Sequence, residues 1–199
     1  MPEELPEAFC QGIRALTRVL DPQDNSVGGG TASALAGAMA ASLLAMVGRL
    51  SLGRKGMEPE GFYLPLVKEA QSLAERLLHG AHEDAQAFDQ VMEARRLPRD
   101  TQEQERDRSL AIQRALQRAA RVPLENARSC SRVLELIRVI QGRFNPNTSS
   151  DWECARHLAA AALLGCLENV RVNLSSLEDT NTVNHLKEQL ELLRMTVTP

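Results

Sequence analysis

The chain has 199 residues, of which 43% are hydrophobic, 25% are charged and only 3% are aromatic, and its formal net charge is −3. This length suits one sizeable core, filled with Ala and Leu rather than with aromatic rings. A weakly acidic chain with few aromatic residues lacks both the positive field and the stacking platforms that bind nucleic acids, so we expect no nucleic-acid partner.

The first half of the chain predicts three helices, because its apolar residues recur every three or four positions. These helices cover residues 5–20, 31–50 and 62–94. The inward-facing residues are expected to include Phe9, Ile13, Leu16 and Leu20 in the first helix, and Leu66, Leu73, Leu77, Phe88 and Val91 in the third. Leu97-Pro98 then ends the third helix, because the residue before a proline disfavours helical geometry.

The second predicted helix lies in a segment, residues 25–48, that carries no charge. Its length raises the question of a membrane span. Its apolar residues are mostly Ala and Gly, which gain little from lipid, so we predict a buried helix and no membrane partner. Small residues recur every fourth position and let another helix approach closely, which suggests a homodimer seam as well as a core; they are Ser33, Gly37, Ala41 and Ala45.

The second half of the chain predicts the remaining helices. Thr101 with Gln104 forms a capping box for a helix that Pro123 should kink or interrupt, followed by a continuation over residues 124–140. Ser150 with Glu153 forms a second capping box, and the last two helices cover residues 151–172 and 179–195. The prediction is an all-α protein: a single antiparallel helical bundle of five to six main helices, forming one domain over residues 1–199.

The cysteine and histidine residues argue against a metal site. The four cysteines are far apart and form no CxxC pair, so we expect them reduced in a cytoplasmic protein that shows no signal-peptide pattern. His79 and His82 lie beside Glu83 and Asp84, as at the corner of a metal site, but no further ligand follows. A solvated helix face is the better interpretation, and we predict no metal.

Three segments contain candidate functional residues. Gly28, Gly29 and Gly30 precede a helix, where flexible backbone presents N–H groups to a ligand. Asp84 lies at the margin of an apolar helix face, where partial desolvation raises the pKa of a carboxylate and suits it to proton transfer. The loop 145–151 gathers amides, hydroxyls and a carboxylate at a helix start, in Asn145, Asn147, Thr148, Ser149, Ser150 and Asp151.

Each segment also has an ordinary interpretation. The three glycines form neither a Walker loop nor a dinucleotide fingerprint, because no Lys-Ser/Thr follows and no strand precedes them. Taken by itself, Asp84 is better explained as an ordinary solvated carboxylate. A turn and a helix cap alone also explain the loop residues, with Ser150 as the capping residue.

Taken together and in this order, the segments resemble the formiminotetrahydrofolate cyclodeaminase and methenyltetrahydrofolate cyclohydrolase family over nearly the whole chain. The similar segments are Gly28-Gly29-Gly30-Thr31-Ala32-Ser33-Ala34-Leu35-Ala36-Gly37-Ala38, Asp84-Ala85-Gln86-Ala87-Phe88, Ile112-Gln113-Arg114-Ala115-Leu116, Ala119-Ala120-Arg121-Val122-Pro123-Leu124, the loop from Asn145 to Asp151, and Asn169-Val170-Arg171-Val172-Asn173-Leu174. The segments 112–116 and 119–124 belong to one motif, so five weak motifs in one register make a strong resemblance.

The resemblance implies a homodimeric, cytoplasmic helical bundle that acts on tetrahydrofolate one-carbon units without a metal or a separate cofactor. The expected reaction converts 5-formiminotetrahydrofolate to 5,10-methenyltetrahydrofolate with release of ammonia. A cyclohydrolase that gives 10-formyltetrahydrofolate and a non-catalytic dimeric folate-binding module are the alternatives. By family position the proton-transfer residue is Asp84, and the substrate-binding residues are Gly28, Gly29, Gly30, Arg54, Lys55, Asn145, Asn147, Ser149, Ser150 and Asp151.

The sequence departs from the family pattern at two places. Ser26-Val27 stands before the glycines, where the family usually has proline. Gly53-Arg54-Lys55-Gly56-Met57 lacks one basic residue and the aromatic residue of the usual Gly-Lys-Lys-Lys/Tyr segment. These positions are expected to affect affinity for the folate tail or ring.

Overall fold

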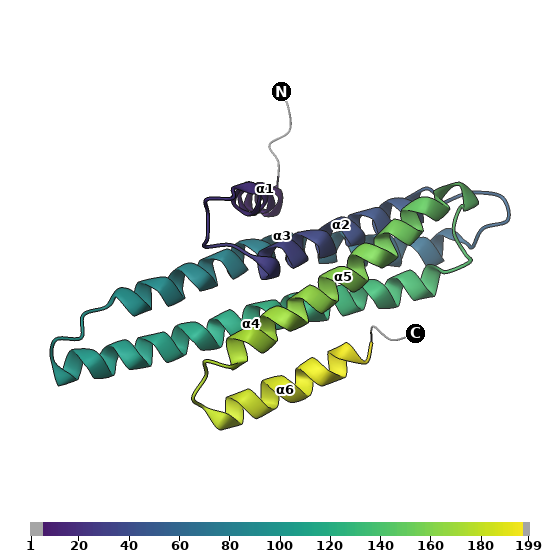
Figure 1. Cartoon of the computed structure of the whole chain (residues 1–199). Coiled ribbons are helices and arrows are strands. Elements are labelled where there is room, and N and C mark those ends of the chain that lie inside the picture. Colours follow the sequence, from purple (N-terminus) through teal and green to yellow (C-terminus); the bar gives the residue numbers. More distant parts are fainter. Residues whose placement is uncertain (1–5, 197–199) are drawn as a thin grey trace.

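Six α-helices and one short 3₁₀ turn make up residues 6–196, the part that the computed structural model describes, and no strand occurs there (Figure 1). The elements are α1 (Glu7–Leu20), α2 (Gly29–Arg49), α3 (Glu60–Arg96), α4 (Gln102–Ile140), η1 (Pro146–Thr148), α5 (Ser149–Leu174) and α6 (Thr180–Arg194). Helices α2 to α5 form an elongated bundle, with α1 and α6 on opposite sides of it (Figure 1). The predicted all-α bundle is confirmed.

Helix α2 runs through the middle of the bundle and contacts α3, α4 and α5. Its small residues allow this close packing: a Cβ added at Gly37 would lie 2.7 Å from the sulfur of Cys130 on α4. Ala41 and Ala45 are only 0% and 4% exposed. The small-residue face therefore packs inside the chain, and its prediction as a dimer seam is wrong. By length and composition α2 could cross a membrane, yet 61% of its most apolar window is buried in the bundle.

Helices α3 and α4 are the longest elements, and the predicted capping box between them is confirmed. The Gln104 N–H donates to the Thr101 hydroxyl at 3.2 Å, and the Thr101 N–H donates to the Gln104 side chain at 3.2 Å. Of the two predicted effects of Pro123, a kink or an interruption, the interruption is wrong, because α4 continues from Gln102 to Ile140. The donor that proline lacks would have paired with the carbonyl of Ala119. That carbonyl instead accepts a hydrogen bond from Asn173 Nδ2 on α5 at 2.7 Å.

The connection from α4 to α5 differs from its prediction. Helix α5 begins at Ser149 with Thr148 as the N-cap, and no side chain caps it. The predicted Ser150–Glu153 capping box is therefore wrong, and the Glu153 carboxylate binds Arg156 one turn later at 2.9 Å. The η1 turn immediately precedes α5 and already has helical geometry, so the helix starts there without a side-chain cap.

Two predicted inward faces are exposed instead. Helix α1 rests on α3 through small residues, so closely that a Cβ at Gly12 would lie 2.4 Å from Leu78 Cδ2. Its large apolar residues point elsewhere and are 40–70% exposed; they are Phe9, Ile13, Leu16 and Leu20. Phe88 on α3 is likewise 41% exposed, although its spacing predicts a position in the core.

Candidate functional site

A cleft of about 360 Å³ opens where α2 begins, between α3, α4 and the end of α5. Asp84 and the three consecutive glycines both line it, so the structure brings these two predicted segments together. Its apolar wall consists of Phe88, Val91, Leu116, Ala119 and Val172, and its polar residues include Arg95, Asn169, Asn173, Ser175 and Ser176. The cleft thus joins one carboxylate and one cation to a largely apolar wall.

The carboxylate of Asp84 is held on both oxygens. Thr31 Oγ1 donates to Oδ2 at 2.8 Å, and Asn169 Nδ2 donates to Oδ1 at 3.1 Å. Burial raises the pKa of Asp84 above its ordinary value, and the hydrogen bonds from Thr31 and Asn169 partly oppose that rise. The expectation of a partly desolvated carboxylate with a raised pKa is confirmed. Such a group is desolvated and held in one orientation, the two features that proton transfer requires of a carboxylate.

The orientation of Asn169 depends on a second amide and on a proline. Asn173 lies one turn after Asn169, and its Nδ2 is 3.5 Å from Asn169 Oδ1. The same nitrogen is anchored on the carbonyl of Ala119, which is free because Pro123 supplies no backbone donor. The contacts therefore run from the proline in α4 through two asparagines in α5 to the carboxylate on α3.

Gly30 provides the space in which these side chains meet. A Cβ at this position would lie 1.7 Å from Asn169 Nδ2 and 2.7 Å from Asp84 Oδ2. Real Cβ atoms essentially never approach another atom so closely, so only glycine fits without displacing the site. By contrast, a Cβ at Gly28 or Gly29 would meet no atom within 4 Å. The third glycine serves packing, whereas the first two leave the backbone open to the cleft.

The loop before the glycines is fixed by one arginine. Arg18 at the end of α1 donates through Nε to Asp24 at 2.9 Å, and its terminal nitrogens reach Asp89 on α3 and the hydroxyl of Ser26. The hydroxyl of Ser26 first, and then Arg18, lower the pKa of Asp24 to about 2. Ser26 departs from the family pattern, in which proline restricts the backbone at this place. Here the hydrogen bonds of Ser26 to Arg18 and Asp24 hold the loop instead.

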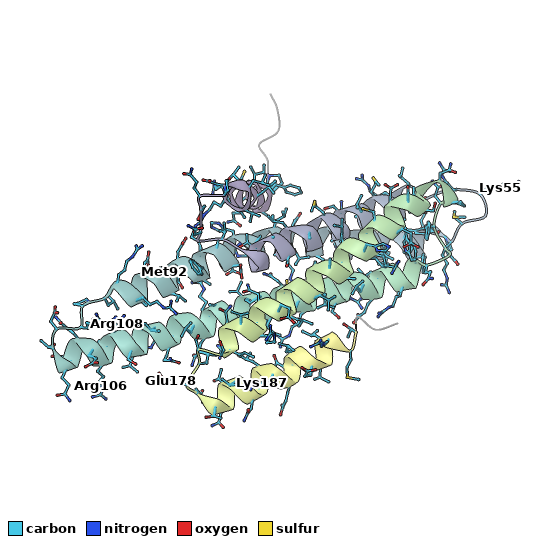
Figure 2. The ribbon with its side chains drawn as sticks, in the orientation of Figure 1. Lys55, Met92, Arg106, Arg108, Glu178 and Lys187 are labelled. Atoms are coloured by element: carbon cyan, nitrogen blue, oxygen red, sulfur yellow. The ribbon has the colours of Figure 1, made fainter. Side chains whose placement is uncertain are left out.

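The other predicted binding residues lie at the opposite end of α2. Arg54 and Lys55 are in the α2–α3 connection, which begins after the 21 residues of α2. At 1.5 Å per residue they are about 30 Å from Gly29 along the helix. Figure 2 shows Lys55 at one tip of the bundle, whereas Met92, two turns beyond Asp84 on α3, lies toward the other. Within one chain the predicted residues therefore form two separate groups.

The second group is organised around a buried amide. Asn145 is only 3% exposed, and its Oδ1 accepts from Arg54 at 3.1 Å and from the N–H of Asn147 at 3.2 Å. Its own N–H donates to Ser51 at 2.9 Å. Asn145 thus ties the α2–α3 connection to the η1 turn. Of the other predicted residues here, Arg54, Lys55, Asn147, Ser149 and Ser150 are exposed, and Asp151 is half-buried in the first turn of α5.

Other candidate groups are accounted for by ordinary contacts. His79 binds Gln11 at 2.8 Å, and His82 binds Gln86 at 2.9 Å. Among residues 6–196, no three His, Cys, Asp or Glu side chains lie together as a metal site would require. A larger cleft of about 500 Å³ lies between α5 and α6. We place the site in the smaller cleft, because it contains a desolvated carboxylate with fixed partners.

Sequence reasoning missed several residues of the cleft. Thr31 and Asn169 hold the carboxylate, Asn173 holds Asn169, and Arg95 supplies the cation. One signal was available: two asparagines spaced four apart lie on the same side of an otherwise Ala- and Leu-rich helix. Half-buried amides on such a face need partners: Asn169 donates to the candidate catalytic residue, and Asn173 donates to the carbonyl of Ala119.

Comparison with known proteins identifies relatives of this chain. The model of the formiminotransferase-cyclodeaminase family matches residues 12–192. A methenyltetrahydrofolate cyclohydrolase of Methylorubrum extorquens is 36% identical over 165 residues, which are 82% of this chain and 79% of that protein. The formimidoyltransferase-cyclodeaminase of Mus musculus is 27% identical over 90% of this chain, but the chain spans only 34% of its length.

A solved structure shows the same fold. The formiminotetrahydrofolate cyclodeaminase of Thermotoga maritima superposes with a TM-score of 0.78 at 24% identity, covering 98% of this chain and 90% of that one. The family model covers nearly the whole chain, and the bundle agrees in fold with a solved cyclodeaminase. On the family model and the relative of 36% identity, the chain belongs to the formiminotransferase-cyclodeaminase family.

Proposed function

We propose that the protein is a one-carbon enzyme acting at the carbon that bridges N5 and N10 of tetrahydrofolate. The observation that supports this most directly is the Asp84 carboxylate, desolvated in a cleft and held on both oxygens by Thr31 and Asn169. A reaction at a carbon between two nitrogens needs a group that removes a proton from one atom and returns it to another. Asp84 has the position and the raised pKa for that role.

The first candidate reaction is the cyclodeaminase reaction. N10 attacks the formimino carbon attached to N5, the attacking nitrogen loses a proton, and the departing nitrogen gains one as it leaves as ammonia. The product is 5,10-methenyltetrahydrofolate. Asp84 accepts the first proton and donates it to the leaving group, so a single carboxylate serves both steps.

The cyclohydrolase reaction is the second candidate, and one observation favours it. The cyclohydrolase of Methylorubrum extorquens has a higher identity than the mouse protein and is matched over 79% of its own length. In this reaction water adds to the methenyl carbon, the bond from that carbon to N5 breaks, and 10-formyltetrahydrofolate forms. Asp84 takes one proton from the water and returns it to N5, and the second proton of the water is released to solvent as the formyl C=O forms, so the same geometry serves.

The rest of the cleft suits a flat ring with an acidic tail. Phe88, Val91 and Leu116 provide an apolar wall for the ring, and the half-exposed Phe88 ring is free to stack on it. Arg95 offers a cation to a tail carboxylate. We further propose that the protein works in the cytoplasm as a homodimer, without a metal or a separate cofactor.

The absorbance of 5,10-methenyltetrahydrofolate tests the proposal and separates the two reactions. Its appearance from 5-formiminotetrahydrofolate, with release of ammonia, supports the cyclodeaminase. Accelerated loss of its absorbance, with formation of 10-formyltetrahydrofolate, supports the cyclohydrolase. If the purified protein changes neither rate, the enzyme proposal is wrong and a non-catalytic folate-binding module becomes the better interpretation.

A further inference from the structure

The carboxamide of Asn169 has a hydrogen-bond donor that the protein does not use. The nitrogen of a side-chain amide carries two N–H groups. Asn169 Nδ2 gives one of them to Asp84 Oδ1 at 3.1 Å, and within residues 6–196 that carboxylate is its only acceptor. Asn169 is half-buried and lines the cleft, so its second N–H is open to a ligand bound there.

The two oxygens of Asp84 have different surroundings. Oδ2 accepts from Thr31 Oγ1 at 2.8 Å, and it lies so close to Gly30 that a Cβ on this glycine would be 2.7 Å away. Oδ1 accepts from Asn169. A carboxylate oxygen can accept more than one hydrogen bond, so Oδ1 keeps a place for a proton of the substrate. The basic oxygen and the unused donor are therefore neighbouring groups, with Oδ1 and Nδ2 3.1 Å apart.

The amide of Asn169 is held in one of its two orientations. Its Oδ1 lies 3.5 Å from Asn173 Nδ2, which is anchored on the carbonyl of Ala119 at 2.7 Å. A reversed amide would place its oxygen against the carboxylate of Asp84 and its nitrogen against the donor of Asn173. Both contacts would be unfavourable, because each pairs two acceptors or two donors. Asn173 therefore keeps the N–H groups of Asn169 directed at the carboxylate and the cleft.

The two candidate reactions share one feature at the carbon that bridges N5 and N10. In each of them this carbon carries a third heteroatom, which is the nitrogen that leaves as ammonia or the oxygen that comes from water. Asp84 exchanges a proton with this atom in either reaction, so the atom must bind against Oδ1. An atom at about 2.9 Å from Oδ1 can lie equally near Asn169 Nδ2, because these two protein atoms are themselves 3.1 Å apart.

We propose that Asn169 is a second catalytic residue, which donates its free N–H to this third heteroatom while Asp84 Oδ1 exchanges the proton. The atom gains electron density in both reactions, either when N10 attacks the formimino carbon or when water loses its proton. A donor that is already oriented toward such an atom stabilises the transition state. Asn173 acts through Asn169 as a positioning residue. The inference rests on the proposed function, since those reactions define the heteroatom.

Two variants separate donation to the substrate from support of Asp84. Asn169→Ala removes both the hydrogen bond to Oδ1 and the free donor, whereas Thr31→Val removes only a hydrogen bond to Oδ2. Asn169→Ala should lower kcat by about 10²–10³-fold, the usual cost of losing one transition-state donor, with little change in KM. Thr31→Val is the matched control and should lower kcat by about 10-fold or less, as expected for one ordinary hydrogen bond. Equal losses in the two variants overturn the inference.

The pH dependence of kcat shows whether Asn169 only adjusts the pKa of Asp84. Both variants remove a donor from the charged carboxylate, so both should raise the pKa of Asp84, measured by carboxyl ¹³C NMR. The nearby titratable groups are unchanged: Arg95 in the cleft, and Cys166, whose pKa is raised by its hydrogen bond with Cys130 and by burial. Asn169→Ala should stay slow at every pH. If a higher pH returns it to the wild-type plateau, Asn169 only adjusts Asp84 and the inference is wrong.

A double-mutant cycle tests the role of Asn173. Asn173→Ala releases the amide of Asn169 and should lower kcat by about 10-fold or more, because a catalytic group that is misplaced by about 1 Å loses much of its effect. If Asn173 acts only through Asn169, the double variant Asn169→Ala/Asn173→Ala should be no slower than Asn169→Ala alone. A residue that supports the fold in general would add its own loss to the double variant. Additive losses therefore contradict the positioning role.

The controls distinguish failure of the inference from failure of the proposed function. A wild type that accelerates neither reaction contradicts the proposed function, and the catalytic role of Asn169 with it. An active wild type whose Asn169→Ala variant keeps its kcat within about 10-fold contradicts the inference alone. Circular dichroism and urea unfolding check that each variant is folded. Should Asn169→Ala fail to fold, Asn169→Asp keeps the size of the side chain and removes the donor, and it should lose kcat by at least the same factor.

Discussion

Replacing Gly30 with alanine should separate catalysis from stability. The new Cβ would lie 1.7 Å from Asn169 Nδ2, and ordinary contacts begin at 3.4 Å, so that amide must move by about 1.7 Å. Its hydrogen bond to Asp84, now 3.1 Å long, cannot survive this shift. Because a misplacement of about 1 Å can cost about 10²-fold in rate, we expect turnover to fall by at least that factor.

The stability of this variant should change much less. Overpacking costs about 1–3 kcal/mol, and alanine returns up to about 1 kcal/mol as a better helix former than glycine. The net loss is then about 0–2 kcal/mol, measurable by urea denaturation next to steady-state kinetics. Gly61→Ala is the control, since its Cβ would meet no atom within 4 Å and it lies in the first turn of α3, outside the cleft. Wild-type turnover in Gly30→Ala would refute the argument that this glycine makes room for the site.

Four further predictions concern the site, the core and the α2–α3 connection. Asp84→Asn should lower turnover by about 10²–10⁴-fold with little change in folate affinity, whereas His82→Asn should leave turnover unchanged. Burial raises the pKa of Asp84, so ionisation costs native stability as the pH rises; the Tm of Asp84→Asn relative to wild type should therefore increase from about pH 4 to pH 7, and a constant difference would contradict this. Gly37→Leu should lose about 1–3 kcal/mol or more in urea unfolding, because even a Cβ there would lie 2.7 Å from a core thiol. Charge reversal at Arg54 and Lys55 should weaken folate binding most at low salt, and an affinity independent of salt would place the tail elsewhere.

Helical periodicity was enough to predict most of the fold, because a repeat of three to four residues identifies an element whatever it packs against. It was not enough to predict which side of an element faces inward. The large apolar residues of α1, such as Ile13, are exposed, and the chain buries Gly12 and Ala15 instead. A stripe of large apolar residues indicates a surface that is stabilised by contact with another apolar surface. The sequence does not say whether that second surface belongs to the same chain.

The candidate site could be predicted for Asp84 and the glycines, because both positions combine a local signal with a family position. The distance between them and Arg54 could not, since it depends on α2 being straight and uninterrupted. The roles of Asn169 and Asn173 could not be predicted, because the role of an amide depends on which acceptor it donates to. Their acceptors, a carboxylate on α3 and a backbone carbonyl on α4, are distant in sequence.

The proline inside α4 has a consequence for protein engineering. Replacing a mid-helix proline with alanine is expected to stabilise a helix, because it restores a backbone hydrogen bond. At position 123 the restored N–H would compete with Asn173 for the carbonyl of Ala119. The amide would lose its anchor, and with it the alignment of Asn169 on Asp84. A thermostable variant selected at this position is therefore expected to be a poorer catalyst. A screen for heat resistance alone would then lower the catalytic activity of the selected variants.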